Sequence, residues 1–377
     1  MNPDAPAHPE AGLVSPEQVD RAAAALERGG LVLMPTETVY GVAGRADRPE
    51  AVAALRALSG KPAGALTVHL SRPEDAGRYV DVAAPGVARL LAKLTPGPVT
   101  LRLLADAGRI DQLDAPSDVV SAGGWVALRL PSDDVARAVL SRADGAPVVA
   151  IGARDARGAG ATRFDAVEPA VRDAVSVAID GGPTRFGKGS TVVEFEPDRP
   201  GGPGTGWRVV RSGVYDERYL RKRMVYEVLL VCTGNTCRSP MAAAIARDRL
   251  AKRLGVAGAE LESYGYRVSS AGVSAGPGAA MTREAVEALR ALGVEPGEHR
   301  SSSLTTERVR SADVIYAMTD SHARAVLAID PTAVAKLSRL DPEADVLDPI
   351  GGDAGLYHET AGQIAEALSQ RLADDVP

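Results

Sequence analysis

The residues best suited to chemistry lie together in one short stretch of the second half of the chain. Cys232 follows a run of valines and leucines that is typical of a buried strand, and five residues separate it from Arg238. Ser239 and Pro240 then lead into an alanine-rich segment, with Pro240 expected at the first position of a helix. A strand, a tight loop and a helix N-terminus direct several backbone N–H groups at one point, which favours a phosphate group there.

This stretch supplies both a nucleophile and a charged clamp. The same field favours the thiolate form of Cys232, and a thiolate is the form of cysteine that attacks phosphorus. Arg238 carries a planar guanidinium that can bind two phosphate oxygens at once. Taken singly, these two residues are more often a buried side chain and a surface charge. The complete string CTGNTCRSP at residues 232–240 is rarely produced by chance.

The string CTGNTCRSP resembles the signature of the low-molecular-weight protein tyrosine phosphatase family, which includes bacterial arginine phosphatases. The resemblance implies that Cys232 forms a phosphocysteine and that Arg238 stabilises the phosphoryl oxygens. It also implies that Asp348, held in extended backbone by Pro349, is the general acid that protonates the leaving group. The residues expected to bind phosphate or to support the loop are Thr233, Gly234, Asn235, Thr236, Cys237 and Ser239.

Several loop residues carry separate expectations. Ser239 is expected to donate a hydrogen bond to the thiolate, and Asn235 to shape the loop, because asparagine tolerates left-handed backbone. Two interpretations of Cys237 stay open: a reversible disulfide with Cys232 that protects the nucleophile, or a small buried side chain.

The substrate is predicted from two positions at the mouth of the loop. Within the family, arginine phosphatases carry threonine just before the second cysteine, and tyrosine phosphatases tend to carry a bulky aliphatic residue. This chain has Thr236 there, whose hydroxyl can bond to a guanidinium. Ile350 stands after the Asp-Pro pair, where tyrosine phosphatases often have an aromatic residue. The expectation is phosphoarginine, with phosphotyrosine as the alternative.

Two other classes of protein share parts of this pattern. Thioredoxin-coupled arsenate reductases need further cysteines downstream, and both cysteines of this chain lie in the loop. A non-catalytic phosphopeptide-binding module would be expected to lack the nucleophile or the acid, and both are present. Asp345 and Asp353 are weaker candidates for the acid than Asp348.

The elements that must position these residues alternate between strands and helices, which predicts an α/β domain. The resemblance implies a parallel sheet flanked by helices. Helices are expected at about 240–254, 282–292, 320–329 and 356–374, and strands at about 225–232, 266–271 and 313–318.

A second motif, PTETVYG at residues 35–41, follows a predicted buried strand at 31–34. It resembles the signature of the threonylcarbamoyl-AMP synthase (YrdC-like) family, and the resemblance covers roughly residues 15–215. That family joins threonine, bicarbonate and ATP into threonylcarbamoyl-AMP, the donor for a modified adenosine in tRNA. The resemblance implies a twisted α/β sheet with a concave, positive cavity. It places Thr36, Tyr40, Thr100 and Arg129 around the threonine, and Ser190 and Arg211 toward the phosphates.

The chain departs from this second family where the triphosphate would bind. The family pattern Lys-x-Arg reads SGK at residues 59–61, and Ser-Ala-Asn reads GAR at residues 152–154. A triphosphate needs several positive partners and oxygens that suit a metal ion. Lys61 and Arg154 restore some positive charge. Two interpretations stay open: an active synthase that uses ATP with magnesium, or a scaffold that binds a nucleotide or RNA without synthesis.

The pattern of the first half also predicts an α/β domain. A capping box at residues 15–18 begins a helix that Gly29 and Gly30 end, and a second helix is expected at about 49–58. The residues at 198–206 are predicted to form a flexible loop, and the basic segment 217–224 a solvated helix face that links the halves. Strands are expected at 66–70, 126–130, 148–151, 175–179 and 191–195, with another after the turn at 95–101.

The 377 residues therefore predict two domains, a YrdC-like domain at 1–222 and a phosphatase at 225–377. The net charge of −6 argues against binding nucleic acid through bulk charge. The five histidines show no metal-ligand spacing, so neither a metal site nor a phosphatase cofactor is expected. No apolar run reaches membrane length and no signal peptide is evident, so the expected location is the cytoplasm. The expected partner is a phosphorylated protein, with ATP, threonine and RNA as further candidates for the first domain.

Overall fold

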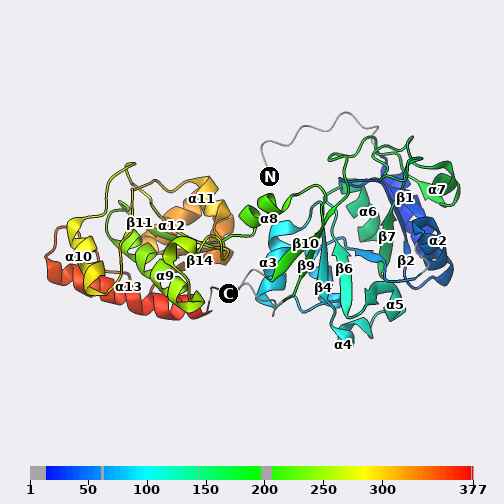
Figure 1. Ribbon diagram of the computed structural model, residues 1–377. Coiled ribbons are helices and arrows are strands. Elements are labelled where there is room, and N and C mark those ends of the chain that lie inside the picture. Colours follow the sequence, from blue (N-terminus) through cyan, green and yellow to red (C-terminus); the bar gives the residue numbers. More distant parts are fainter. Residues whose placement is uncertain (1–13, 61–62, 144, 197–205, 375, 377) are drawn as a thin grey trace. The chain divides into compact units, whose positions relative to one another are not determined.

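The computed structural model describes residues 14–60, 63–143, 145–196, 206–374 and 376, which divide into two compact units (Figure 1). Among these residues, the first unit ends at Met224 and the second begins at Val225. Within the described ranges, no helix combines the length and the apolar character needed to cross a lipid bilayer.

The first unit is built on a mixed sheet. Its strands are β1 (Val32–Met34), β2 (Gly41–Arg45), β3 (Thr67–His69), β4 (Val99–Leu104), β5 (Ser121–Ala122), β6 (Trp125–Arg129), β7 (Val148–Gly152), β8 (Val177–Ala178), β9 (Thr191–Phe195) and β10 (Trp207–Arg211). They pair in the order β10-β9-β4-β6-β3-β7-β2-β1-β8, and β5 pairs with β6. The pairs β1–β8, β3–β6 and β4–β9 are parallel, whereas β2–β7 and β4–β6 are antiparallel.

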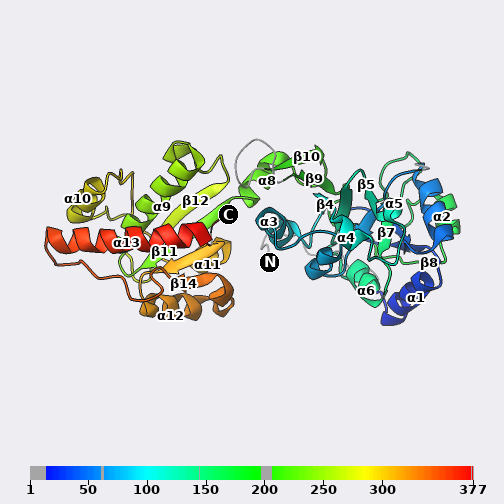
Figure 2. The same cartoon turned by 90° about the horizontal axis from the view of Figure 1, so that it is seen from below.

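Helices cover both faces of this sheet. They are α1 (Pro16–Glu27), α2 (Pro49–Ser59), α3 (Pro85–Leu94), α4 (Ala107–Ile110), α5 (Ser117–Val120), α6 (Asp134–Arg142), α7 (Pro169–Asp173) and α8 (Glu217–Arg223), with a 3-10 turn at Pro73–Arg78. Because side chains alternate along a strand, Val32 and Met34 pack with α1 and α6 on one face. Leu33 joins the core beneath α2 and α3 on the other. Figure 2 shows α1 and α6 on the same side of the sheet.

The second unit has a smaller, parallel sheet. Its strands are β11 (Tyr226–Cys232), β12 (Tyr266–Gly272), β13 (Val314–Ala317) and β14 (Leu337–Arg339), and they pair in the order β12-β11-β13-β14. Its helices are α9 (Arg238–Leu254), α10 (Arg283–Ala291), α11 (Thr306–Ser311), α12 (Asp320–Ile329) and α13 (Ala354–Asp374), with 3-10 turns at Gly258–Glu260 and Pro331–Lys336.

Strand β11 is central to this unit and is buried on both faces. Val228 and Leu230 belong to the core that α9, α10 and α13 share, whereas Leu229 and Val231 belong to the core with α11 and α12. A parallel strand that is covered on both sides is expected to be continuously apolar, as residues 228–232 are, with Glu227 near the start of the strand as the exception. Cys232 is the last residue of this strand, so it lies at the carboxyl edge of the sheet.

Most predicted elements are present, with a few differences. Pro240 was predicted at the first position of its helix, but α9 begins two residues earlier and makes Pro240 its third residue. The helix starts early because the Cys237 carbonyl already accepts a helical hydrogen bond from the N–H of Met241 at 3.1 Å. The strand expected at 175–179 is confined to β8. The loop predicted at 198–206 lies outside the described residues except for Gly206.

Candidate active site and ligand cavity

Cys232 stands where β11 ends and the loop to α9 begins. Its Sγ accepts a hydrogen bond from the backbone N–H of Asn235 at 3.2 Å and lies 2.9 Å from the Ser239 hydroxyl. The next helix begins at Arg238, directly after Cys237. A sulfur at the N-terminus of a 17-residue helix, with N–H and O–H groups aimed at it, is in a field that stabilises negative charge.

Asn235 holds the loop in this shape. Its backbone φ of 55° is in the left-handed region, the one non-glycine case among the described residues. Its side-chain amide donates to Ser239 and Ser270 at 2.8 and 2.9 Å, and its Oδ1 accepts from the backbone of Ser302 at 2.9 Å. Its carbonyl accepts from His299 at 2.7 Å. These bonds fix a conformation that the backbone alone would disfavour, as the sequence predicted for asparagine.

Arg238 is buried, and its guanidinium contacts the predicted acid. Its Nη2 donates to Asp348 Oδ2 at 2.6 Å and to the Thr233 hydroxyl at 3.4 Å, and its Nη1 approaches the Val346 carbonyl at 3.5 Å. The two side chains differ in exposure, at 7% for Arg238 and 48% for Asp348. The structure therefore brings the predicted nucleophile loop, the clamp and the acid together, with the acid on the solvent side.

His322 is a residue that the sequence analysis did not assign to this site. It lies on α12, is buried, and its Nε2 is 2.8 Å from the Thr233 hydroxyl. Burial and the nearby Arg238 lower the pKa of His322 to about 4, so its imidazole is neutral at neutral pH. One feature of the sequence could have indicated its position. Thr319, three residues earlier, is a typical helix N-cap, and its side chain accepts a hydrogen bond from the backbone N–H of His322.

The remaining loop residues surround the second cysteine. Cys237 is buried, and its Sγ lies 3.5 to 3.7 Å from the hydroxyls of Thr236, Thr282 and Tyr357. Thr236 is partly exposed, next to Gly234 in the same loop. Ile350, by contrast, is 69% exposed beyond the Asp-Pro pair.

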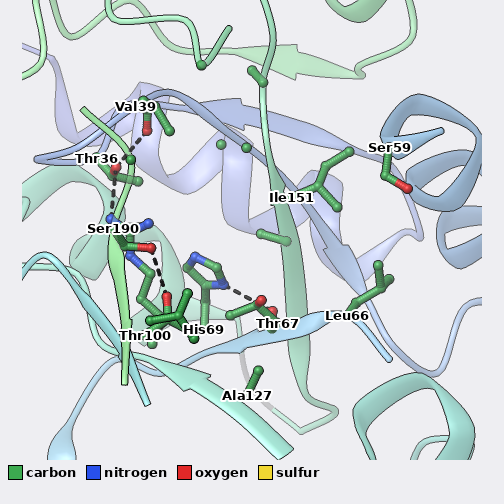
Figure 3. A pocket seen from close by; sticks show the side chains of 18 of the residues that line it. Thr36, Val39, Ser59, Leu66, Thr67, His69, Thr100, Ala127, Ile151 and Ser190 are labelled. Carbon is green, nitrogen blue, oxygen red and sulfur yellow. Dashed lines mark hydrogen bonds between the residues drawn. The ribbon is translucent and has the colours of Figure 1, made fainter. Parts of the chain in front are cut away.

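The first unit contains a cavity of about 660 Å³ (Figure 3), a size typical of sites for small ligands. Six of the seven residues predicted for a threonine and nucleotide site line it: Thr36, Tyr40, Thr100, Arg129, Ser190 and Arg211. Lys61, the seventh, lies outside the described residues. Figure 3 shows the Thr100 and Ser190 hydroxyls facing each other, and they are 2.9 Å apart.

Two arginines define the polar end of this cavity. Arg129 is buried, and its Nη2 donates to Glu37 at 3.0 Å and to the Thr36 hydroxyl at 3.2 Å, while its Nε has no hydrogen-bond partner. Arg211 donates to the carbonyl and the hydroxyl of Ser190 at 3.0 and 3.1 Å. Burial and the neighbouring Arg129 lower the pKa of Arg211. This end of the cavity is suited to an anion.

Tyr40 and His69 complete the walls. The Tyr40 hydroxyl donates to the Gly182 carbonyl at 2.7 Å and accepts from the backbone of Gly181, and burial raises its pKa. Burial and Arg129 lower the pKa of His69 to about 3, and its Nδ1 donates to the Thr67 carbonyl at 3.1 Å (Figure 3). The sequence analysis had not assigned His69 to this site.

The residues fit an anion better than they fit a metal-bound triphosphate. The described lining includes the guanidinium groups of Arg129, Arg154 and Arg211 and no carboxylate. Magnesium sites usually use one or two carboxylates besides the phosphates. Across the described ranges, no cluster of three or more His, Cys, Asp or Glu residues suits a metal ion. Arg154 itself donates to the Ser59 carbonyl at 3.1 Å.

Two family models match the chain. Residues 24–213, about half of its length, match the Sua5/YciO/YrdC family, whose description reads telomere recombination. Residues 227–376 match the low molecular weight phosphotyrosine protein phosphatases. The chain is also 38% identical over 149 residues to a protein-arginine-phosphatase of Bacillus subtilis, a match that covers 93% of that protein and 38% of this chain. The chain belongs to both families.

Bacterial proteins are similar to each of the two units. The phosphatase unit is 36% identical over 166 residues to low molecular weight protein-tyrosine phosphatase A of Mycobacterium tuberculosis, covering 96% of that protein and 40% of this chain. The YrdC-like unit is 32% identical over 195 residues to threonylcarbamoyl-AMP synthase of Bacillus subtilis, covering 49% of this chain. In that case the chain spans 54% of the relative's length.

Proposed function

We propose that the second unit hydrolyses phosphorylated protein side chains through a phosphocysteine. The observation that carries the proposal is the position of Cys232 Sγ, which meets the Asn235 N–H and the Ser239 hydroxyl at the start of α9. The Cys232 thiolate forms an S–P bond as the bond from phosphorus to the leaving group breaks. Water then attacks phosphorus, the S–P bond breaks, and inorganic phosphate and the thiolate are regenerated.

Arg238 and Asp348 have complementary roles in this proposal. Arg238 binds the phosphoryl oxygens and stabilises their charge in the transition state. Asp348 gives a proton to the leaving group in the first step and takes one from water in the second. Arg238 and Asp348 are 2.6 Å apart. In this proposal, a phosphoryl group that enters the loop replaces Asp348 on Arg238, and the carboxyl then stays near the leaving group.

The proposed substrate is phosphoarginine, in preference to phosphotyrosine. The partly exposed Thr236 offers a hydroxyl that can bond to a planar guanidinium, and a threonine is short enough to leave room for it. The exposed Ile350 provides no aromatic ring to stack on a phenol. This unit is 38% identical to an arginine phosphatase and 36% identical to a tyrosine phosphatase. Sequence identity therefore does not decide between the two substrates.

Turnover of matched phosphoarginine and phosphotyrosine peptides by the full chain tests this choice. The wild type should prefer phosphoarginine. Thr236→Ile should lower phosphoarginine turnover and raise phosphotyrosine turnover, because it exchanges a polar contact for an apolar one. Thr236→Ser, which keeps the hydroxyl, is the matched control and should keep the preference. A wild-type preference for phosphotyrosine, or an unchanged ratio in Thr236→Ile, would assign the unit to phosphotyrosine.

For the first unit, we propose a ligand-binding scaffold without synthase activity. The support is a cavity with Arg129 and Arg211 at one end, combined with the altered SGK and GAR stretches at 59–61 and 152–154. Arg154 and Arg211 would hold the phosphates of a nucleotide that binds there without a metal ion. The alternative is an active threonylcarbamoyl-AMP synthase.

An assay of the full chain with threonine, bicarbonate, ATP and magnesium separates these two possibilities. The scaffold proposal expects nucleotide or threonine binding by calorimetry and no threonylcarbamoyl-AMP above the background without enzyme. Sustained product formation that is lost in Arg211→Leu, which leaves no buried charge behind, would establish the synthase instead.

A further inference from the structure

His322 joins the phosphate loop to the start of a helix from another part of the unit. Its Nε2 lies 2.8 Å from the Thr233 hydroxyl, and its Nδ1 lies 2.7 Å from the Thr319 hydroxyl. Thr319 is the N-cap of α12, and His322 is 4% exposed. A buried imidazole that is bonded at both nitrogens has a fixed orientation, so Thr233 has a rigid partner on this side.

One arrangement of protons uses every contact in this chain. Arg238 can only donate, so its Nη2 donates to the Thr233 hydroxyl, which in turn donates to His322 Nε2. His322 Nδ1–H then donates to Thr319, whose hydroxyl lies 2.8 Å from that of Ser321. The low pKa of His322, about 4, agrees with a neutral ring that accepts at Nε2.

The contact with Thr233 matters because Arg238 loses its strongest partner during the proposed reaction. In the structure, Asp348 accepts from Arg238 at 2.6 Å, whereas Thr233 and the Val346 carbonyl are 3.4 and 3.5 Å away. Once Asp348 turns to the leaving group, these two weaker contacts are what remain to orient the guanidinium besides the phosphoryl group. A hydroxyl that is itself held by His322 orients better than a freely rotating one.

On the basis of the proposed phosphatase function, we propose that His322 is a positioning residue for phosphoryl binding. It fixes the Thr233 hydroxyl, and that hydroxyl keeps the Arg238 guanidinium directed at the phosphoryl site when Asp348 leaves it. His322 does not touch the substrate in this scheme, and its contribution passes through Thr233.

Two substitutions at one position separate this role from simple support of α12. His322→Gln keeps an acceptor near the Nε2 position and can still bond to Thr233, but it gives up the bond to Thr319. His322→Asn keeps a group near the Nδ1 position and the bond to Thr319, but it no longer reaches Thr233. The positioning role predicts that Asn is the more damaging change. A role confined to the helix start predicts the opposite order.

The measurements are the dissociation constant of inorganic phosphate, by calorimetry on the full chain, and kcat and KM on the phosphopeptide that the wild type prefers. In His322→Asn, phosphate binding and kcat/KM should each weaken by about five- to tenfold, the effect of losing one hydrogen bond to a charged network, with kcat changing less. His322→Gln should stay within about threefold of the wild type. His358→Gln, at an exposed histidine of α13, is the matched control and should have no effect.

Changes at Thr233 provide a second test that does not depend on the folding of the His322 variants. Thr233→Val should weaken phosphate binding as His322→Asn does, and Thr233→Ser should restore it. Combining Thr233→Val with His322→Asn should cost no more than either change alone, because both break the same contact.

The outcomes distinguish the two proposals. If the wild type binds phosphate and turns over a phosphopeptide, but His322→Asn and Thr233→Val bind phosphate as the wild type does, the positioning role is wrong and the phosphatase proposal stands. Equal or reversed damage by Asn and Gln would also overturn it. If the wild type neither binds phosphate nor hydrolyses either phosphopeptide, both proposals fall.

Discussion

Each unit buries one arginine beside one carboxylate, and the two pairs differ in how the carboxylate is held. In the first unit, Arg129 and Glu37 are 8% and 3% exposed, so both charges are enclosed. In the second, Arg238 is 7% exposed but Asp348 is 48% exposed, on the loop before α13. An enclosed pair cannot separate without leaving a buried charge, whereas a half-exposed carboxylate can move into water. The first pair is therefore suited to fixing a cavity wall, and the second to exchanging partners during a reaction.

The largest expected effect is at the nucleophile, and it tests whether the second pair belongs to a reacting site. Cys232→Ser should lower turnover by at least about 10⁴-fold, because a serine hydroxyl does not ionise here near neutral pH. Inorganic phosphate should still bind, since the loop amides and Arg238 remain. Steady-state kinetics and calorimetry on the same preparation check both parts, and turnover that survives the substitution would remove Cys232 as the nucleophile.

The next effect tests whether Asp348 exchanges partners. Asp348→Asn should slow hydrolysis by about 10²–10⁴-fold for substrates whose leaving group needs a proton. The loss should shrink for an activated aryl phosphate, which departs unaided. The variant should also bind inorganic phosphate more tightly than the wild type, because Arg238 no longer has a competing carboxylate. Equal rate losses for both kinds of substrate, or weaker phosphate binding, would contradict the exchange.

For the enclosed pair, Arg129 and Glu37, the test is the free energy of unfolding of the first unit. Arg129→Leu leaves Glu37 buried without its guanidinium and should destabilise the first unit by about 3–5 kcal/mol. Arg211→Leu is the matched control: Arg211 bonds to the carbonyl and hydroxyl of Ser190 rather than to a carboxylate, so its loss leaves no buried charge. Denaturant unfolding measures both variants. A destabilisation by Arg129→Leu no larger than that by Arg211→Leu would show that the two pairs are not as different as their exposures suggest.

The smallest effect concerns a second carboxyl near the enclosed pair. Burial, with a further contribution from Glu37, raises the pKa of Asp133 from 3.8 to about 6. Because the folded pKa is raised, the stability from this group is present below pH 3.8 and is lost as the pH rises through 6. Asp133 caps α6 by accepting from Ala136, and asparagine can do the same without ionising.

Asp133→Asn should therefore stabilise the first unit at pH 8 by about 1–2 kcal/mol more than at pH 4. Melting curves of the wild type and the variant at the two pH values measure the difference. A variant whose benefit is the same at both pH values would show that Asp133 is not held in its neutral form.

The two sites also differ in how far the sequence could predict them. The phosphate loop occupies the consecutive residues 232–239, and its shape follows from local rules: a strand end, an asparagine that accepts a left-handed φ, and a helix N-terminus. The string was therefore informative by itself. The cavity residues run from Thr36 to Arg211 and meet only because β4, β6, β9 and β10 pair in one sheet. Without the family resemblance, nothing local would have joined them.

His322 and Glu37 illustrate what pattern reasoning missed. His322 is 89 residues from Thr233, and its contact depends on α12 packing against the carboxyl edge of the second sheet. Glu37 is part of a recognised motif, but its pairing with Arg129 spans 92 residues. The position of Pro240 in its helix was also wrong, because the loop's own geometry sets where α9 begins.

The sequence by itself determined the two families, the motif of the phosphate loop and many of the strands and helices, because periodicity and short motifs act over a few residues. It did not predict β2, β14, α3, α6 or α11. The tertiary structure alone decided which side chains meet: Asp348 on Arg238, His322 on Thr233, and Arg129 on Glu37. It also decided how exposed each partner is. The exposure of a charged side chain depends on which segments of the chain cover it. Those segments are distant in the sequence, so exposure is a property of the whole folded unit.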